Sequence, residues 1–193
     1  MKFVDKIYSQ THEVKQSKFI AYLMPYQDYE LKLQALKNKH PKARHFVVAY
    51  RYLNEFNQIV EHSSDDGEPK GTSGKPSLFV LQGADMINTA VIIVRYFGGT
   101  KLGTGGLVRA YSDGVNLVLN SATLLEYTQN IERTISFEYS NTRVIDYEAS
   151  ACGIVVVKKI FDSKVIYKLK ATQENMDKFL DKVDRKISIY PLP

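Results

Sequence analysis

The sequence lacks several features that define whole classes of protein. Its 193 residues include one cysteine, Cys152, which excludes an internal disulfide framework and any metal site built from several cysteines. No apolar run approaches the roughly 18 to 20 residues that cross a bilayer, and the first residues contain no uninterrupted apolar segment typical of a signal peptide. We therefore expect a cytoplasmic protein of a reducing compartment, with no membrane partner.

Motifs for bound metals and cofactors are missing as well. No two histidines show the i, i+4 spacing of a zinc-binding helix, and Cys152 has small and apolar neighbours that favour a packed, inert thiol. The histidines are His12, His40, His45 and His62. We therefore expect no metal site and no cofactor.

Glycine is nearly absent from the last third of the chain. Ten of the 11 glycines lie between Gly67 and Gly114, and only Gly153 follows them. This asymmetry predicts two architectures, an N-terminal α/β domain over residues 1–128 and a second domain over residues 131–193.

The second domain shows clear periodicity. Apolar and polar residues alternate over 131–139, as in a half-buried strand, and Thr172 precedes an apolar stripe with helical spacing. The predicted order is β-α-β-β-α-β, the split unit of ferredoxin-like domains. The predicted elements are a strand over 131–139, a helix over 142–152, strands over 154–161 and 164–170, a helix after Thr172, and a strand over 187–190.

The first domain is less regular, but it also resolves into helices and strands. The run AVIIV predicts a strand buried on both faces, and Asp28 is placed to cap a helix that ends before Pro41. The predicted strands cover 18–24, 45–52, 58–62 and 88–96, and the helices cover 28–40, 76–82 and a segment that begins near Gly105. The fold class is therefore α+β.

The strongest candidate site is the segment VRYFGGTKLGTGGLVRAY, residues 94–111. A buried strand leads through a glycine-rich loop into a helix, so backbone N–H groups and the positive end of the helix can converge on a phosphate or carboxylate. The glycines equally suit a tight turn with close packing. Neither the phosphate-loop motif nor G-x-G-x-x-G is present. The candidate binding glycines are Gly98, Gly99, Gly103, Gly105 and Gly106.

Basic residues concentrate in the same region, and the whole chain has a formal net charge of +5. Between residues 69 and 112, Asp85 is the one acidic residue against five basic ones. Such a patch suits nucleic-acid phosphates, and Tyr96 and Phe97 offer stacking surfaces if they point outward, whereas inward-facing rings would belong to the core. The basic residues are Lys70, Lys75, Arg95, Lys101 and Arg109.

An acidic segment, EHSSDDGE, covers residues 61–68. Its carboxylates could hold a hard cation, or Asp66 and Glu68 could act as general bases, but we favour a loop in which these acids form turns and pair with nearby basic residues. His45 and Arg51 project from one face of a predicted strand, which is either a binding surface or a solvated one.

Three blocks together resemble the IMPACT/YigZ family: ARHFVVAYR at 43–51, DDGEPKGTSGKP at 65–76, and the glycine-rich segment at 94–111. The resemblance implies an N-terminal domain with the left-handed βαβ fold of a ribosomal-protein domain and the GHMP kinases. It also implies a ferredoxin-like second domain similar to those of elongation factor G. The candidate surface residues it carries over are His45, Arg51, Asp66, Glu68, Arg95, Lys101 and Arg109.

The family resemblance points towards translation. Eukaryotic IMPACT proteins use an additional N-terminal domain to restrain a starvation-activated kinase, whereas here the shared domain begins almost at Met1. We therefore expect a translation-associated regulatory or binding protein that contacts RNA, the ribosome or a ribosome-associated protein through a basic, glycine-rich surface. The alternative is a small-molecule phosphotransferase or another enzyme that binds a phosphate-type anion.

Overall fold

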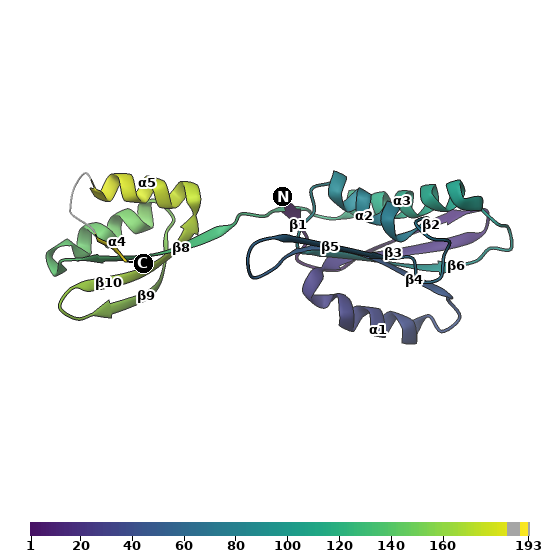
Figure 1. Ribbon diagram of the computed structural model, residues 1–193, viewed down its shortest axis with the longest axis horizontal. Helices are drawn as coiled ribbons and strands as arrows, with labels where there is room; N and C mark the ends of the chain where they lie inside the picture. The colour runs from purple at the N-terminus through teal and green to yellow at the C-terminus, as the bar shows by residue number, and fades with distance from the viewer. Residues whose placement is uncertain (185–189, 193) are drawn as a thin grey trace. The chain divides into compact units, whose positions relative to one another are not determined.

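The computed structural model describes residues 1–184 and 190–192. The chain divides into two compact units, Met1–Tyr127 and Thr128–Pro193 (Figure 1). Each unit combines helices with an antiparallel sheet, so the α+β fold class is confirmed.

The first unit contains a five-stranded sheet, three α-helices and a short two-stranded ladder. Its elements are β1 (Lys2–Phe3), β2 (Tyr8–Val14), β3 (Ser17–Pro25), the 3-10 turn η1 (Tyr26–Asp28), α1 (Tyr29–Lys39), β4 (His45–Leu53), β5 (Ile59–Ser64), α2 (Gly74–Gly83), β6 (Thr89–Tyr96), α3 (Gly103–Ser121) and β7 (Leu125–Glu126).

The strand order in the main sheet is β2-β3-β6-β4-β5, and every neighbouring pair is antiparallel. β6 is the central strand, and its residues from Ala90 to Val94 have no exposed surface. The prediction of a strand buried on both faces is therefore confirmed. The pairing of β4 with β6 sets His45 opposite Arg95 at one end of both strands.

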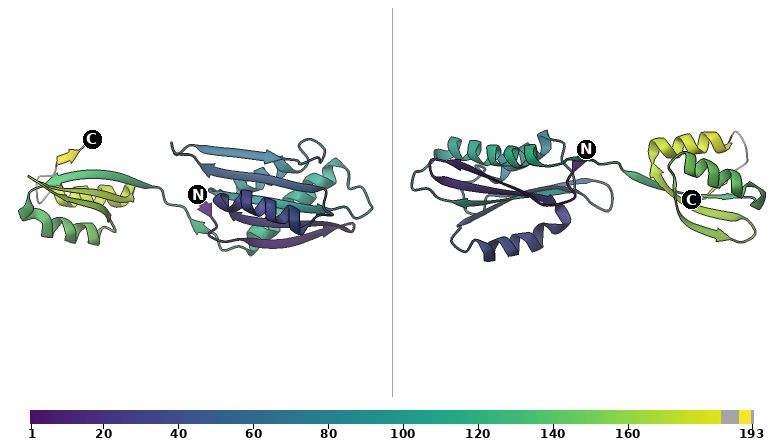
Figure 2. Two further views of the ribbon diagram at one scale, coloured as in Figure 1. Left: turned by 90° about the horizontal axis from the view of Figure 1, so that it is seen from below. Right: turned by 180° about the vertical axis from the view of Figure 1, so that it is seen from behind.

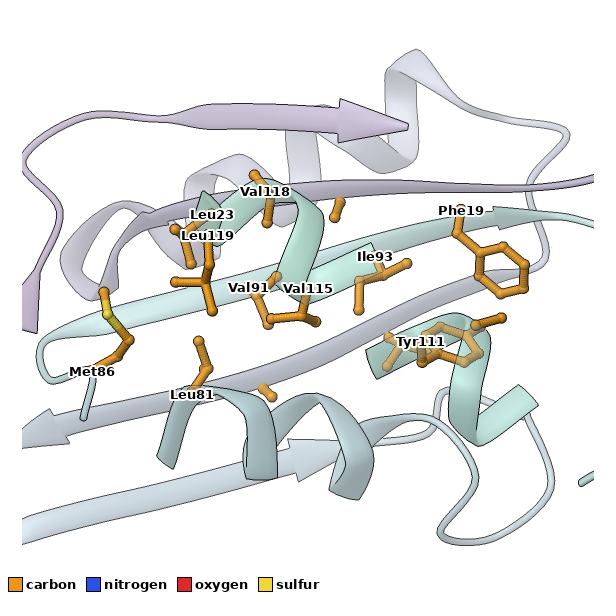
Figure 3. Close-up of a cluster of buried hydrophobic side chains, with 14 of the residues drawn as sticks. Phe19, Leu23, Leu81, Met86, Val91, Ile93, Tyr111, Val115, Val118 and Leu119 are labelled. Carbon is orange, nitrogen blue, oxygen red and sulfur yellow. The ribbon is translucent and has the colours of Figure 1, made fainter. Parts of the chain in front are cut away.

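Helices cover both faces of this sheet, with α1 on one face and α2 and α3 on the other (Figures 1 and 2). Alternate residues of each strand face opposite ways, so Val91 and Ile93 pack under α2 and α3 while Ile92 faces α1. Figure 3 shows the core on the α3 side. There the rings of Phe19 and Tyr111 pack edge to face, with their centres 5.0 Å apart.

Several helix starts differ from the sequence-based expectations. Asp28 lies at the N-cap of α1, but its backbone is already helical at the end of η1 and its side chain makes no capping bond. α2 begins at Gly74 and α3 at Gly103, each two residues before the expected start. The first turn of each helix contains glycine, so the spacing of apolar residues does not mark where the helix begins.

The strand β2 was not predicted at all. It forms the edge of the sheet, and its sequence YSQTHEV is mostly exposed, so no apolar alternation marks it. The small ladder of β1 with β7 was also missed, because a pair of two-residue strands carries no periodicity.

The second unit has the predicted order of elements. They are β8 (Asn130–Phe137), the 3-10 turn η2 (Tyr139–Asn141), α4 (Thr142–Ala151), β9 (Val155–Phe161), β10 (Val165–Thr172), α5 (Gln173–Asp184) and β11 (Tyr190–Leu192), with strand order β11-β8-β10-β9. Residues 187–189 of the predicted last strand lie outside the described residues.

Local details of the second unit match the expectations from sequence. The hydroxyl of Thr172 accepts the backbone N–H of Asn175 at 3.2 Å and so caps α5, and Gly153 follows α4 with a φ of +66°. Cys152 is a buried free thiol in the core of this unit. Among the helices of the described residues, none is long and apolar enough to cross a bilayer.

Candidate functional site: a cationic hollow at the end of β4 and β6

The buried carboxylate of Glu68 joins three elements of the first unit. Its side chain is 3% exposed, and Oε1 accepts hydrogen bonds from Arg95 Nη1 at 2.5 Å and from the Tyr111 hydroxyl at 2.7 Å. Glu68 lies in the loop before α2, Arg95 near the end of β6, and Tyr111 in α3. Burial raises the pKa of Tyr111, and the charge of Glu68 raises it further, so this hydroxyl remains a hydrogen-bond donor.

A second carboxylate, Asp65, closes the loop before α2. It accepts the backbone N–H groups of Gly71 at 2.7 Å, Ser73 at 3.1 Å and Gly74 at 2.8 Å, and the Ser73 hydroxyl at 2.7 Å. Burial alone would raise the pKa of Asp65, but these hydrogen bonds outweigh it and hold the pKa below its ordinary value. Asp65 therefore satisfies donors that the start of α2 would otherwise leave unpaired.

The third carboxylate, Asp66, holds the start of β4. Its Oδ2 accepts the backbone N–H of Phe46 at 2.6 Å, while its backbone carbonyl lies 2.9 Å from Nδ1 of His45. Because a carbonyl oxygen can only accept, Nδ1 carries a proton and donates it to this carbonyl. The other ring nitrogen, Nε2, lies 4.0 Å from Glu68 Oε1. All three acids are engaged by the protein's own donors, as the favoured interpretation of the acidic segment predicts.

Next to this network lies a hollow of about 460 Å³, which we call the cationic hollow. Four of its lining side chains are lysine or arginine, and none of the described residues that line it is acidic. Within the described part of the chain, no carboxylate oxygen approaches Lys42, Arg44 or Lys101 within 4.0 Å. The lining residues are Lys42, Arg44, His45, Arg95, Tyr96, Phe97 and Lys101.

A neighbouring hollow of about 350 Å³ shares Arg95, Phe97 and Lys101 with the cationic hollow. Gly103 and Thr104, the first residues of α3, line it as well. The positive end of a 19-residue helix thus lies beside the lysine and arginine side chains.

Tyr96 and Phe97 point in different directions. The Tyr96 hydroxyl lies 2.9 Å from Nδ1 of His40, and its ring packs against the α1-side core, whereas Phe97 is 58% exposed. Of the two rings, Phe97 is therefore the one that offers an open surface beside the hollow.

The five candidate glycines have different roles. A Cβ at Gly98 would lie 2.0 Å from the backbone carbon of Gln16, so Gly98 is required for packing against the β2–β3 turn. Gly99 and Gly103 have φ values of +86° and +72°, and no heavy atom lies within 4 Å of a Cβ added at either position. Gly106 lies near Leu102 and lines another hollow.

Gly105 differs from Gly99 and Gly103, because its φ is not positive. This residue lies in the first turn of α3, where helical φ is negative, and no heavy atom lies within 4 Å of a Cβ added there. A side chain is therefore accommodated at this position.

Other candidate residues lie away from the cationic hollow. Arg51 is buried at the opposite end of β4, where it bonds Glu61 at 2.7 Å and the carbonyl of Met86 at 2.8 Å, so it is a structural residue and not a surface one. Arg109 lines a different hollow with Asp113, and Lys70 is exposed in the loop before α2.

The sequence reasoning did not identify Lys42, Arg44 or Tyr111. Lys42 and Arg44 directly precede β4, and the antiparallel register with β6 brings them beside Arg95. Knowledge of this strand pairing would have been needed to find them. The ring of Tyr111 packs in the core under α3, and the sequence alone does not show that its hydroxyl donates to Glu68.

Comparisons with known proteins show the family to which the chain belongs. Residues 15–119 match the family described as Impact N-terminal domain. The chain is 33% identical over 182 residues to an IMPACT family member of Haemophilus influenzae, covering 91% of this chain and 87% of that protein. It is also 33% identical over 174 residues to the IMPACT family member YigZ of Escherichia coli, covering 89% and 85%.

A solved structure described as a hypothetical protein matches all of this chain and 97% of its own, with 28% identity and a TM-score of 0.67. The similarity to the Haemophilus influenzae and Escherichia coli proteins extends beyond the N-terminal domain through most of the second unit. The chain therefore belongs to the bacterial-type IMPACT family.

Proposed function

We propose that this protein is a cytoplasmic, translation-associated binding protein that contacts RNA on or near the ribosome through the cationic hollow. The observation that carries the proposal is that Lys42, Arg44 and Lys101 line one hollow, and that no carboxylate of the described residues lies within ion-pair distance of them. A single unpaired cation on the surface has little effect on stability, but several cations around one hollow repel each other. This repulsion favours the binding of a polyanion. Family membership supports the link to translation, because the resemblance to IMPACT proteins implies that context.

The fold supports a more specific assignment of the first unit. α1 connects β3 to β4, and α2 connects β5 to β6; each connection joins parallel strands that are separated by one antiparallel strand. The strands β3 and β4 run antiparallel to β5 and β6, the two connections run in opposite directions across the sheet, and their helices lie on opposite faces. Such an arrangement requires opposite hands, and so supports a left-handed crossover in the manner of the ribosomal-protein and GHMP-kinase fold.

For the second unit we propose a ferredoxin-like domain similar to those of elongation factor G. Its element order and its strand order, with the fourth and first strands adjacent and the third between the first and second, support this assignment. We place the two domains at residues 1–128 and 131–193.

One observation favours an alternative function. Two adjoining hollows of about 350 and 460 Å³ share Arg95 and Lys101, and such volumes suit a small phosphorylated substrate. A phosphotransferase would bind a nucleotide together with Mg²⁺ at this position.

Fluorescence anisotropy with a labelled single-stranded RNA, measured at two salt concentrations, tests the proposed function. We expect binding that weakens with salt, and Lys101→Ala should reduce the slope of log K against log salt by about 0.7, the contribution of one phosphate contact on a single strand. Lys6→Ala is the matched control, because Lys6 is exposed in the same unit and does not line either hollow. It should leave the slope nearly unchanged.

A thermal-shift measurement with ATP and Mg²⁺ serves as the competing test. Salt-insensitive RNA binding together with a large thermal shift from ATP would reject the RNA-binding proposal in favour of the phosphotransferase.

A further inference from the structure

We infer that the cationic hollow recognises the phosphomonoester of a nucleoside 5′-phosphate, presented by the 5′-phosphorylated end of an RNA. This inference rests on the proposed function and names the part of the RNA that the hollow accepts. A free nucleoside 5′-monophosphate has the same chemistry, and the experiment below separates the two sources.

The charge of the hollow suits a dianion better than an internal RNA phosphate. Lys42, Arg44 and Lys101 lack ion-pair partners in the described part of the chain, and only Arg95 is compensated, by Glu68. A phosphodiester carries one negative charge, whereas a terminal phosphate carries about 1.5 to 2 at neutral pH and has three strong acceptor oxygens. Three uncompensated cations around one hollow therefore favour the terminal group.

The guanidinium of Arg95 provides an independent observation. Arg95 is 7% exposed and lines the hollow. Its Nη1 donates to Glu68, but its Nε has no hydrogen-bond partner among the residues that the structure describes. A buried, charged group with an unsatisfied donor is costly, and a phosphate in the hollow that Arg95 lines would place negative charge beside this guanidinium. Arginine suits this role because its planar donors match the geometry of phosphate oxygens.

Arg95 is also held in place before any ligand binds. Its guanidinium carbon lies 5.4 Å from the ring centre of Phe19 and 5.8 Å from that of Phe97, and the Glu68 carboxylate fixes Nη1. Little side-chain entropy remains to be lost on binding, so the guanidinium is a preorganised phosphate contact.

Phe97 accounts for the nucleoside part of the ligand. Its exposed ring lines the same hollow as the cations, and an aromatic face beside a phosphate site stacks on a base without regard to sequence. The cations would hold the phosphate while Phe97 contacts the first base.

The experiment compares two RNAs of one sequence that differ only in a 5′-phosphate or a 5′-hydroxyl, each labelled at the 3′ end. We expect the phosphorylated RNA to bind the full-length protein at least tenfold more tightly. Arg44→Ala should reduce this preference to about threefold or less, whereas Lys6→Ala should retain it. Circular dichroism confirms that each variant is folded.

A nucleoside 5′-monophosphate is then added as competitor. Displacement of the phosphorylated RNA only at concentrations far above the Kd of that RNA supports the RNA end as the source, because the chain beyond the first nucleotide contributes contacts. Displacement at concentrations equal to that Kd would identify the mononucleotide as the ligand and overturn the assignment to RNA.

The remaining outcomes separate this inference from the proposed function. Equal, salt-sensitive binding of both RNAs would overturn the phosphomonoester inference and leave RNA binding intact. Absence of binding by either RNA would reject the proposed function and, with it, the assignment to an RNA end. Phe97→Leu should weaken binding of both RNAs by a similar factor, because the stacking contact is common to them.

Discussion

Replacement of Glu68 by glutamine should destabilise the first unit far more than the loss of one hydrogen bond suggests. Glutamine retains an oxygen that can accept from Tyr111, but it removes the charge that compensates the buried guanidinium of Arg95. Breaking one partner of a buried ion pair costs about 3 to 5 kcal/mol, and a domain of this size is stable by about 5 to 15 kcal/mol. We therefore expect Glu68→Gln to remove about 3 kcal/mol or more of the free energy of unfolding.

Hydrogen exchange measured by mass spectrometry at increasing urea concentrations provides the assay, because it reports on each unit separately. Amides of β6 should lose protection in Glu68→Gln, while those of β10, in the other unit, serve as an internal control. Glu13→Gln is the matched variant, since Glu13 forms an exposed ion pair with Lys18 and should cost less than about 0.5 kcal/mol.

A paired replacement makes this reasoning sharper. Adding Arg95→Met to Glu68→Gln removes the uncompensated charge, so the double variant should be more stable than Glu68→Gln alone. A loss below about 1 kcal/mol in Glu68→Gln, or a further loss in the double variant, would refute the view that charge compensation dominates at this site.

Three further predictions concern the loops and the junction. Gly98→Ala should lower the free energy of unfolding in urea by about 2 kcal/mol or more, because its Cβ would overlap the Gln16 backbone. Gly105→Ala should raise the free energy of unfolding by about 0.5 to 1 kcal/mol. Equal effects of the two substitutions would contradict the assigned packing. Asp65→Asn should lower the free energy of unfolding by about 1 to 2 kcal/mol near neutral pH. The difference between the variant and the original protein should shrink as the pH falls below about 3.8, because the pKa of Asp65 is lowered in the folded state and the stabilisation is lost as the folded carboxylate is protonated. A pH-independent difference would exclude the charge as the cause. Limited proteolysis of the full chain should cut near residues 128–130 and release a fragment of about 60 residues if the two domains fold separately, whereas stable cleavage within the β9–β10 hairpin would contradict that division.

Whether a helix or strand can be predicted from the sequence depends on which of its faces are buried. β8, α4 and α5 have one face on a core and one towards solvent, so the sequence alternates with the matching period and each element was predicted within a few residues. β6 was recognised for the opposite reason, because both its faces are buried and its run is continuously apolar. β2 has neither signal, since its stability derives from hydrogen bonds to β3 and from contacts with α3.

The acidic segment illustrates a different limit. Sequence favoured paired acids over a cation site there, but it assigned no role to Asp65, which makes four of the hydrogen bonds that form the loop. Its acceptors are satisfied by residues six to nine positions later, a spacing set by the turn at Gly67 and Gly71, both of which have positive φ. No periodic pattern encodes such a closure.

The positions of the three arginines that the family resemblance carries over, Arg51, Arg95 and Arg109, show why the site itself could not be found without the tertiary structure. Arg51 and Arg95 both lie on strands and both point to the α2 and α3 side, but the antiparallel register places them at opposite ends of the sheet. At one end Glu61 neutralises Arg51. At the other end Glu68 accepts a hydrogen bond from a single nitrogen of Arg95, and the remaining cations of the hollow have no ion-pair partner among the described residues. Arg109, on the outer side of α3, belongs to neither group. Charge and motif alone make these residues equivalent. Only the register of β4 against β6, together with the position of each acidic residue, decides which arginine is structural and which lines the cationic hollow.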